Sequence, residues 1–213
     1  MQPSHTFSAQ PSWDRGVRRS IQGVGPLDWD AELMLRVRDG DDASFGLLLE
    51  RHRDAVIHFL YRMVQLQAIA EELAQEVFLR VYRARGTYQP TAKFSTWLFR
   101  IATHLALNWI RDGKNETCQE SLDQVDDDFG PRQVSDNAKT VEQELIYQVR
   151  LREIRHAIEM LPSKQRAAVL MHKYQEMEYS EIAGALSCSE SAVKSLLFRA
   201  YESLRGRLAH MAA

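Results

Sequence analysis

The 213-residue sequence contains few cysteines and no long hydrophobic segment, and each absence narrows the function. Its two cysteines, Cys118 and Cys188, lie far apart and predict neither a disulfide framework nor a zinc site. No run of about 18 apolar residues occurs, so we expect no membrane insertion. The N-terminus lacks the apolar core of a signal peptide, which makes the cytoplasm the expected location.

Sequence signatures of catalysis are also missing. The sequence has no glycine-rich phosphate loop, and its seven histidines are scattered along the chain. We find no arrangement of a histidine and a carboxylate that indicates a metal site. We therefore expect a protein that is not an enzyme, with no catalytic residue, no metal ligand and no cofactor.

The charge is distributed unevenly along the chain. The net charge of −2 arises partly from residues 115–141, which contain seven acidic and two basic residues. Residues 80–114 contain seven basic residues, opposed only by Asp112. Phosphate binding depends on such local clusters and not on the total charge. Nucleic acid is therefore a candidate partner in spite of the negative total.

The hydrophobic periodicity predicts an all-α protein with two small helical domains. Apolar residues recur at helical spacing over 28–112 and again over 141–208, and no strand pattern of any strength appears. Residues 113–140 are polar and acidic, which predicts a flexible acidic linker. Residues 1–27, rich in Pro, Ser, Gln and Gly, predict a disordered tail, and residues 209–213 form a short C-terminal tail.

Residues near the helix ends predict where helices begin and stop. Gly40 should end the first helix, and residues 42–64 suit either one long helix or a pair of buried helices. Ser95 or Thr96 is the expected N-cap of the helix that follows the "GTYQPTAK" break. In the second domain, residues 140–143 have the spacing of a capping box formed by a threonine and a glutamine.

The end of the sequence predicts a helix-turn-helix, in which the second helix enters the major groove of DNA. Ala183 allows the two helices to cross closely, and Cys188 is expected to fill the turn as a small apolar side chain. The apolar positions with this spacing are Ile182, Ala183, Leu186, Cys188, Val193 and Leu196.

The outward face of the second helix combines cations with an aromatic ring. It contains Lys194, Ser195, Phe198 and Arg199. Lys and Arg suit phosphates or guanine acceptors, and an apolar side chain suits the thymine methyl group. The alternative is an ordinary solvated helix face, but an isolated helix gains nothing from exposing the ring of Phe198 to water.

Four sequence blocks in order resemble the sigma-70 family of bacterial transcription initiation factors, and in particular its small extracytoplasmic function (ECF) group. The resemblance covers about residues 29–112 and 141–208. It rests on the blocks "AEELAQEVFLRVYR", "FSTWLFRIATHLALNWIR", "LPSKQRAAVLMHKYQEMEYSEIAGAL" and "SAVKSLLFRAYESLR".

The resemblance implies a non-catalytic subunit that binds core RNA polymerase and directs it to promoters. It implies that double-stranded −35 DNA is contacted by Lys194, Ser195, Phe198 and Arg199. It implies that single-stranded −10 DNA is contacted by Lys93, Trp97, Arg100, His104, Asn108 and Arg111. It implies that the polymerase is contacted by Glu72, Gln75, Glu76 and Phe78. Members of the family are commonly held inactive by an anti-sigma factor, which is therefore an expected partner.

The sequence departs from the family pattern at four of its positions. Relatives often have asparagine where this chain has His104, aspartate at Glu72 and arginine at Leu196. They usually have serine at the N-cap of the first helix of the helix-turn-helix, where this chain has Glu178, whose charge still suits the helix dipole. The alternative function is a stand-alone helix-turn-helix regulator, whose N-terminal domain senses a signal or dimerises. Such a regulator would need neither the "EELAQEVF" block nor the basic and aromatic stretch 93–111.

Overall fold

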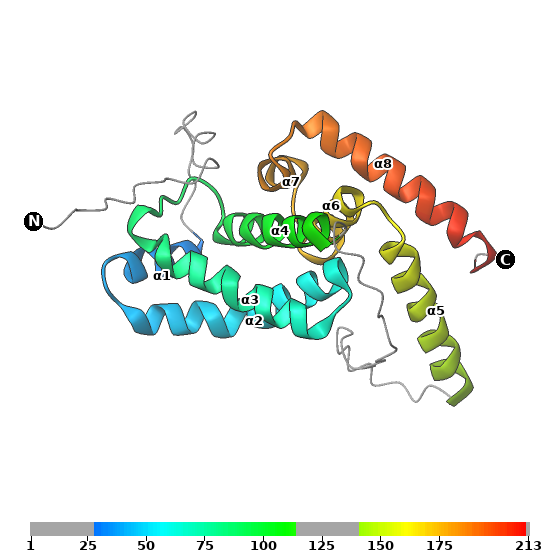
Figure 1. The fold of residues 1–213 in the computed structure, drawn as a ribbon, viewed down its shortest axis with the longest axis horizontal. Helices are drawn as coiled ribbons and strands as arrows, with labels where there is room; N and C mark the ends of the chain where they lie inside the picture. The colour runs from blue at the N-terminus through cyan, green and yellow to red at the C-terminus, as the bar shows by residue number, and fades with distance from the viewer. Residues whose placement is uncertain (1–27, 114–140, 212–213) are drawn as a thin grey trace, which may run out of the picture.

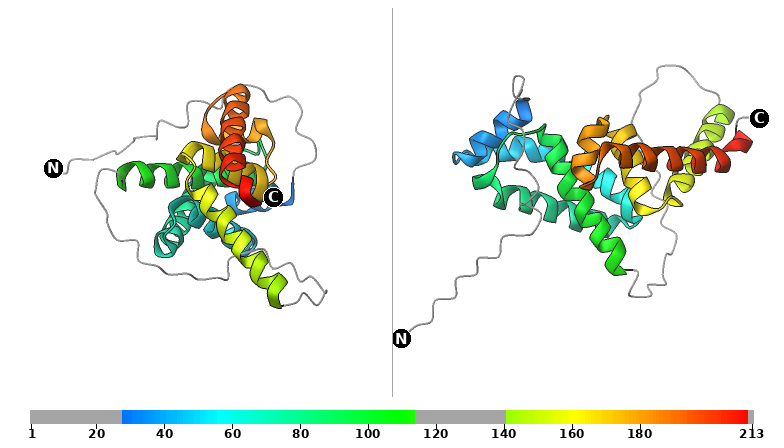
Figure 2. Two further views of the ribbon diagram at one scale, coloured as in Figure 1. Left: turned by 90° about the vertical axis from the view of Figure 1, so that its right-hand side faces the viewer. Right: turned by 90° about the horizontal axis from the view of Figure 1, so that it is seen from above.

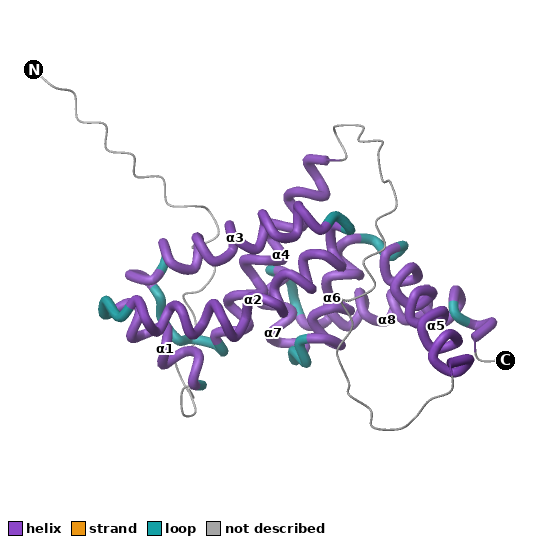
Figure 3. The backbone as a smooth tube through the Cα atoms, turned by 90° about the horizontal axis from the view of Figure 1, so that it is seen from below, coloured by secondary structure: helices purple, strands orange, loops and turns teal. Residues whose placement is uncertain are grey.

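The computed structural model describes residues 28–113 and 141–211, and every regular element in these two ranges is a helix (Figure 3). Neither range contains a strand, which confirms the predicted all-α fold. The predicted tail at 1–27 and the predicted linker beyond Gly113 lie outside the described residues. The proposed capping box at 140–143 lies outside them as well.

The first domain contains four α-helices and one short 3-10 turn. Helices α2 and α3 pack side by side, α1 contacts α2, and α4 packs on both α2 and α3 (Figure 1). Residues 42–64 form one long helix and not a pair. The elements are α1 (Trp29–Arg38), α2 (Asp42–Val64), α3 (Gln67–Arg83), η2 (Arg85–Thr87) and α4 (Phe94–Gly113).

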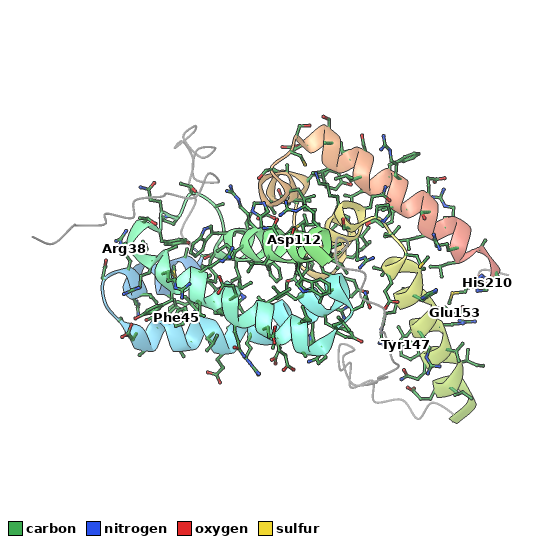
Figure 4. All side chains as sticks on the ribbon, in the orientation of Figure 1. Arg38, Phe45, Asp112, Tyr147, Glu153 and His210 are labelled. Carbon is green, nitrogen blue, oxygen red and sulfur yellow. The ribbon has the colours of Figure 1, made fainter. Side chains whose placement is uncertain are left out.

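The second domain begins with a helix that projects away from the body of the molecule (Figure 1). Its last three α-helices pack on one another, and the C-terminal His210 Nε2 lies 3.1 Å from a carboxylate oxygen of Glu153 on the projecting helix (Figure 4). The elements are α5 (Val141–Glu159), α6 (Ser163–Tyr174), α7 (Tyr179–Leu186), α8 (Glu190–Arg207) and η3 (Ala209–Met211).

Asp28 fixes the start of two helices that are far apart in the sequence. One of its carboxylate oxygens accepts a hydrogen bond of 2.6 Å from the backbone N–H of Ala31 in the first turn of α1. The other accepts one of 3.3 Å from the backbone N–H of Phe94, where α4 begins. One carboxylate therefore satisfies two N–H groups that lack partners inside their own helices.

The predicted N-cap of α4 at Ser95 or Thr96 is wrong. The helix begins at Phe94, and the carbonyl oxygen of Lys93 accepts the bond of 3.4 Å from the N–H of Trp97 that opens the first turn. A serine or threonine cap is not needed because the carboxylate of Asp28 takes its place. The end of α1 is as predicted, since Gly40 follows it with φ of +102°, a conformation that favours glycine.

In the helix-turn-helix, one cap is as predicted and the turn is not. Glu178 precedes α7 in extended conformation, and its N–H donates a bond of 2.8 Å to Oε2 of Glu181. The side chain of Cys188 is exposed and fills no core space, although its backbone N–H donates to the carbonyl oxygen of Ala183. Leu197 is buried with Val193 and Ala200, whereas Leu196, predicted from its spacing as a core position, is only partly buried.

The buried side chains of both domains form one continuous apolar cluster. In the first domain, the rings of Phe59 and Phe99 meet edge to face with centroids 5.3 Å apart. Across the domain boundary, the hydroxyl of Thr103 on α4 lies 3.9 Å from the sulfur of Met171 on α6, and both residues are inaccessible to solvent. No helix of the described ranges is long and apolar enough to span a bilayer.

Replacing the shared cap should destabilise the first domain. Asp28→Ala removes the acceptor for the N–H groups of Ala31 and Phe94, so the free energy of unfolding should fall by roughly 1–2 kcal/mol. The control is Asp39→Ala, which removes an exposed carboxylate paired only with its neighbour Arg38 and should change stability by less than about 0.5 kcal/mol. Urea unfolding followed by circular dichroism measures both, and equal losses would contradict the bridging role.

Candidate nucleic-acid interface

Helix α8 is held so that one face packs on the second domain and the other faces solvent. Ser187 ends α7 in the left-handed conformation, with φ of 53°. The side chain of Ser189 then caps α8 by accepting a hydrogen bond of 3.2 Å from the N–H of Ala192. Val193, Leu197 and Ala200 are buried beneath the helix. This turn and cap set the direction in which the outer face of α8 points.

The four residues predicted to contact −35 DNA lie together on that outer face. We call this set the α8 face, and it consists of Lys194, Ser195, Phe198 and Arg199. These residues line one open hollow of about 400 Å³. The side chain of Phe198 is 68% exposed, more than any other large hydrophobic side chain that the structure describes. The hydroxyl of Ser195 donates to the carbonyl oxygen of Ser191 at 3.0 Å.

The chemistry of the α8 face suits a DNA groove better than water. Phe198 offers an apolar ring that is not covered by the fold, next to the cations of Lys194 and Arg199. Across the described part of the chain, neither cation is held in an ion pair. Cations with no ionic partner in the protein can bind phosphate or guanine without breaking a contact first.

The residues predicted to contact −10 DNA follow one line along α4. The steps between them are four, three, four, four and three residues, which keeps them within a sector of about 80° on a helix. We call this line the α4 stripe, and it consists of Lys93, Trp97, Arg100, His104, Asn108 and Arg111. Lys93, Asn108 and Arg111 are exposed, and the other three are partly buried.

Trp97 is held from one side by other aromatic residues. Its ring centroid lies 5.0 Å from that of Tyr88 and 5.9 Å from that of Phe94. Both of these rings are buried, and burial raises the pKa of the Tyr88 hydroxyl far above its ordinary value. The partly exposed indole is therefore positioned by a rigid cluster, which favours stacking on an unpaired base.

His104 is uncharged at neutral pH. Burial is the main cause that lowers its pKa below the ordinary value of 6.5, and the positive charge of Arg100, one turn earlier, lowers it further. A neutral imidazole offers the α4 stripe one hydrogen-bond donor and one acceptor and adds no third cation between Arg100 and Arg111.

The residues predicted to contact polymerase divide between the surface and the core. Glu72 and Gln75 are exposed on α3, and Glu76 is partly exposed and pairs with Arg80 at 2.7 Å. Phe78, in contrast, is only 6% exposed and packs in the apolar cluster.

The apolar side chain that α3 presents to solvent is Leu79, which is 48% exposed. It lies on one side of the helix with Glu72, Gln75 and Glu76, because steps of three and four residues share a helix face. Sequence reasoning missed Leu79, although the sequence carried a signal. Val77 and Val81 are both buried and leave Leu79 on the opposite side.

Within 28–113 and 141–211, no group of three or more histidine, cysteine or acidic residues could hold a metal ion. A second hollow, of about 450 Å³, lies beside the loop that joins α6 to α7 and is lined by His172, Met177 and Tyr179 among others. There His172 Nδ1 lies 3.0 Å from the hydroxyl of Tyr201 on α8, and both side chains are partly buried.

Two family models match the chain, one in each domain. The model described as Sigma-70 region 2 matches residues 48–116, and the model described as Sigma-70, region 4 matches residues 151–204. Both matches contain the elements that present the surfaces described above. Region 2 includes α3 and α4, and region 4 includes α7 and most of α8.

Curated relatives agree with these matches over most of the chain. The RNA polymerase sigma-H factor of Pseudomonas aeruginosa is 27% identical over 180 residues, which cover 82% of this chain and 91% of the relative. The ECF RNA polymerase sigma-E factor of Escherichia coli (strain K12) is 28% identical over 184 residues, which cover 84% of this chain and 94% of the relative.

Solved structures share the fold. CnrH in complex with the cytosolic domain of CnrY has a TM-score of 0.62 at 19% identity, covering 85% of this chain and 97% of that one. The sigma factor RpoE in complex with the anti-sigma factor NepR, from Bartonella quintana, has a TM-score of 0.61 at 20% identity, covering 78% and 96%. The chain belongs to the sigma-70 family of RNA polymerase sigma factors. Within that family it falls in the extracytoplasmic function group.

The lowered pKa of His104 predicts a pH-dependent stability. Because the folded state disfavours the charged imidazole, the unfolded chain binds more protons below pH 6.5. The free energy of unfolding should therefore fall as the pH decreases from about 6.5 toward the lower pKa of the folded state. A histidine-selective NMR titration should place the His104 transition below 6.5.

The matched variant is His104→Gln, which keeps a polar side chain but cannot titrate in this range. Its stability should decrease less than that of the wild type between pH 7.5 and pH 5.5. His58 and His172 also have pKa values lowered by burial, so a residual dependence should remain. An identical pH dependence in both proteins would contradict the assignment to His104.

Proposed function

We propose that the protein binds core RNA polymerase in the cytoplasm and directs it to promoters, reading the −35 element with the α8 face and holding the melted −10 element on the α4 stripe. The observation that carries this proposal is the α8 face, where an uncovered aromatic ring and two cations line one hollow on the second helix of a helix-turn-helix. In this role the protein is a non-catalytic subunit.

The α8 face suits duplex DNA in the major groove. The N-terminal half of a recognition helix meets base edges, and α8 presents its four residues between its second and third turns. Phe198 can press on thymine methyl groups while Lys194 and Arg199 contact phosphates or guanine. The hydroxyl of Ser195, which donates its hydrogen to the backbone, is left to accept one from a base.

The α4 stripe suits a single strand. Proteins hold unpaired bases with aromatic faces and follow the backbone with cations. Trp97 provides the aromatic face, and Lys93, Arg100 and Arg111 provide cations at intervals of about two and three helical turns. The helix is rigid because its opposite side is buried in the first domain. Bases can therefore be captured without ordering a loop first.

The outer side of α3 is the proposed contact with core polymerase. Glu72, Gln75 and Glu76 lie on the N-terminal side of the exposed Leu79, and Arg80 and Arg83 lie on its C-terminal side, which gives a polar rim around an apolar centre. Interfaces commonly have this arrangement of an apolar core and a polar rim. The solved relatives CnrH and RpoE are complexes with CnrY and the anti-sigma factor NepR. We extend the same kind of regulation, by an anti-sigma factor, to this chain.

The requirement for core polymerase distinguishes the proposed function from the alternative, a stand-alone helix-turn-helix regulator. A promoter footprint made with and without core polymerase should show protection of both elements only when the polymerase is present. Tight, specific binding by the purified protein alone, unchanged by core polymerase, would favour the alternative.

Substitutions on the α8 face should weaken promoter recognition. Lys194→Ala and Arg199→Ala should each cost about 1–3 kcal/mol of binding at the −35 element, because each removes a cation from the groove. Binding of the assembled holoenzyme to a promoter duplex, measured by fluorescence anisotropy, gives the value.

The matched control is Arg207→Ala, which removes an exposed arginine from the last turn of the same helix. It should leave the affinity within about 0.5 kcal/mol of the wild type. Unchanged affinity in both α8-face variants would remove this face from the reading of the −35 element.

We expect Leu79 to contact core polymerase directly, whereas Phe78 is buried in the apolar cluster. Leu79→Ala truncates an exposed side chain, so the fold should remain intact while affinity for core polymerase falls by roughly 1–2 kcal/mol. The control is Leu66→Ala, at the other end of α3, where a 41% exposed leucine is truncated in the same way. Equal affinities of Leu79→Ala and wild type for core polymerase, in a pull-down titration, would contradict the proposed contact.

A further inference from the structure

The hollow beside the loop that joins α6 to α7 has no role in the proposed function. It measures about 450 Å³ and lies at the start of the first helix of the helix-turn-helix. Met177 is buried there, whereas both glutamates and the tyrosine are exposed. We call it the acidic hollow, and it is lined by His172, Glu176, Met177, Glu178 and Tyr179.

The acidic hollow has more negative than positive charge around it. Residues 175–181, with the sequence QEMEYSE, contain three glutamates and no basic residue. Glu181 is paired with Lys93 at 3.2 Å, but the carboxylates of Glu176 and Glu178 form no ion pair with any described residue. One cation, Lys173, acts electrostatically on the nearby His172. Two carboxylates therefore remain available to a further cation.

Part of the lining of the acidic hollow is aromatic. The ring centroids of His172 and Tyr179 lie 5.5 Å apart, with an angle of 41° between the ring planes. Burial is the main cause that lowers the pKa of His172 below 6.5, so this ring is uncharged at neutral pH and does not repel a cation. Arginine suits such a place, because its guanidinium can stack on an aromatic ring and pair with a carboxylate at the same time.

Elsewhere in the protein, arginine already binds aromatic rings in this way. Three guanidinium groups of the described ranges lie over a ring, at 4.0, 4.2 and 5.8 Å from its centroid. No described arginine lies over Tyr179, although its side chain is 37% exposed. The three pairs are Arg85 with Tyr82, Arg62 with Tyr174 and Arg36 with Trp29.

The chain itself contains a group of arginines before the first described residue. Residues 12–20, with the sequence SWDRGVRRS, contain Arg15, Arg18 and Arg19 and one acidic residue, Asp14. We call these residues the basic segment. Its net positive charge is complementary to the two unpaired glutamates of the acidic hollow.

The described chain begins close to the acidic hollow. Asp28 accepts a hydrogen bond of 3.3 Å from the N–H of Phe94, where α4 begins, and α7 packs next to α4 (Figures 1 and 2). The hydroxyl of Thr96 donates one of 3.1 Å to Glu181 on α7. The other carboxylate oxygen of Glu181 accepts one of 2.8 Å from the N–H of Glu178. These contacts form a continuous path from Asp28 to the edge of the hollow.

The basic segment is near enough in sequence to reach the acidic hollow. The lengths of the contacts and side chains along that path place Asp28 within roughly 25 Å of Glu178. The nine residues from Arg19 to Asp28 extend to about 30 Å at about 3.3 Å per residue. All three arginines can therefore reach the hollow from the position of Asp28.

We propose that the basic segment of this chain binds the acidic hollow, with an arginine over the ring of Tyr179 and guanidinium groups against the carboxylates of Glu176 and Glu178. The consequence of this binding rests on the proposed function. The first helix of a helix-turn-helix crosses the DNA backbone, so unpaired glutamates at the start of α7 repel phosphates. Bound arginines match these charges and add positive charge at the same edge of the DNA-binding domain.

The first experiment tests this binding in the full chain without DNA or polymerase. A nitroxide is attached at Gln22→Cys, with Cys118 and Cys188 replaced by serine, and the broadening of backbone amide NMR signals is measured against the reduced label. Residues 175–181 should be strongly broadened. Reversing the charge of all three arginines of the basic segment to glutamate should remove most of that broadening. Equal broadening in the two proteins would overturn the proposal.

Charge exchange tests the acidic side of the contact. Glu176→Arg should reduce the broadening, and its combination with the charge-reversed basic segment should restore it, because opposite charges then face each other again. The control is Glu50→Arg, the same change on an exposed residue of α2, which should leave the broadening as it is in the parent. Equal effects of Glu176→Arg and Glu50→Arg would contradict binding at the hollow.

A mixing experiment tests whether the basic segment binds within its own chain. Spin-labelled protein without nitrogen-15 is mixed with nitrogen-15 protein without the label. Residues 175–181 should then show no broadening. Broadening in the mixture would assign the hollow to the basic segment of a second copy and overturn binding within one chain.

The last experiment connects the acidic hollow to DNA binding. Tyr179→Leu removes the aromatic ring but keeps every charge of the chain, so it should reduce the broadening while circular dichroism stays unchanged. The affinity of the assembled holoenzyme for a promoter duplex should fall roughly twofold to fivefold, the size expected for exposed charges that lose their partners. Unchanged broadening would overturn the stacking on Tyr179, and unchanged affinity would contradict the consequence for DNA binding.

These outcomes distinguish this proposal from the proposed function. Broadening that depends on the arginines and on Glu176, in a protein that binds neither promoter DNA nor polymerase, would support the contact and contradict the function. A protein that directs polymerase to promoters, but shows equal broadening in the parent and the charge-reversed variant, would support the function and contradict the contact.

Discussion

The structure depends on α4 being packed from two directions at once. One side of this helix, which includes Phe94, Phe99 and Ala102, is buried in the first domain, and a second side, with Thr96 and Thr103, meets the second domain. A helix turns by 100° per residue, so only one sector remains for solvent. That sector is the α4 stripe. The direction in which the predicted −10 residues point is therefore fixed by two separate packing contacts, neither of which involves nucleic acid.

Local sequence signals predicted the helices well because a helix is specified by its own periodicity. The end of α1 at Gly40 and the cap of α7 at Glu178 were recognisable for the same reason, since each depends on residues close in sequence. The start of α4 was not recognisable, because its cap is the carboxylate of Asp28, 66 positions away. The exposed Cys188 shows the same limit. A small apolar residue in a turn can point to either side, and only the packing of α7 on α8 decides which.

Some residues of the candidate sites could be predicted from the sequence and others could not, for a related reason. The residues of the α8 face and of the α4 stripe are grouped in space because each set lies on one helix, where steps of three and four residues suffice. Phe78 and Leu79 are adjacent and both apolar, so the choice between core and surface depends on how α3 rotates against α2. Glu181 carried only the signal of a capping residue. Nothing local indicates that its second oxygen reaches Lys93, because the pairing joins two domains.

Arg166 binds backbone carbonyl oxygens on both sides of the domain boundary. Besides the carbonyl oxygen of Met63, its guanidinium binds the carbonyl oxygens of Glu159 and Leu161 at the end of α5, and burial lowers its pKa. If the domains part, the two carbonyls within its own domain still hold it, and water can replace Met63. Lys93 lies near solvent, where water can replace Glu181 as its partner, and the mostly buried carboxylate of Glu181 keeps the hydrogen bond from the N–H of Glu178 in its own domain. The boundary can thus come apart and re-form without stranding a buried charge, which is the condition for a joint that is used repeatedly.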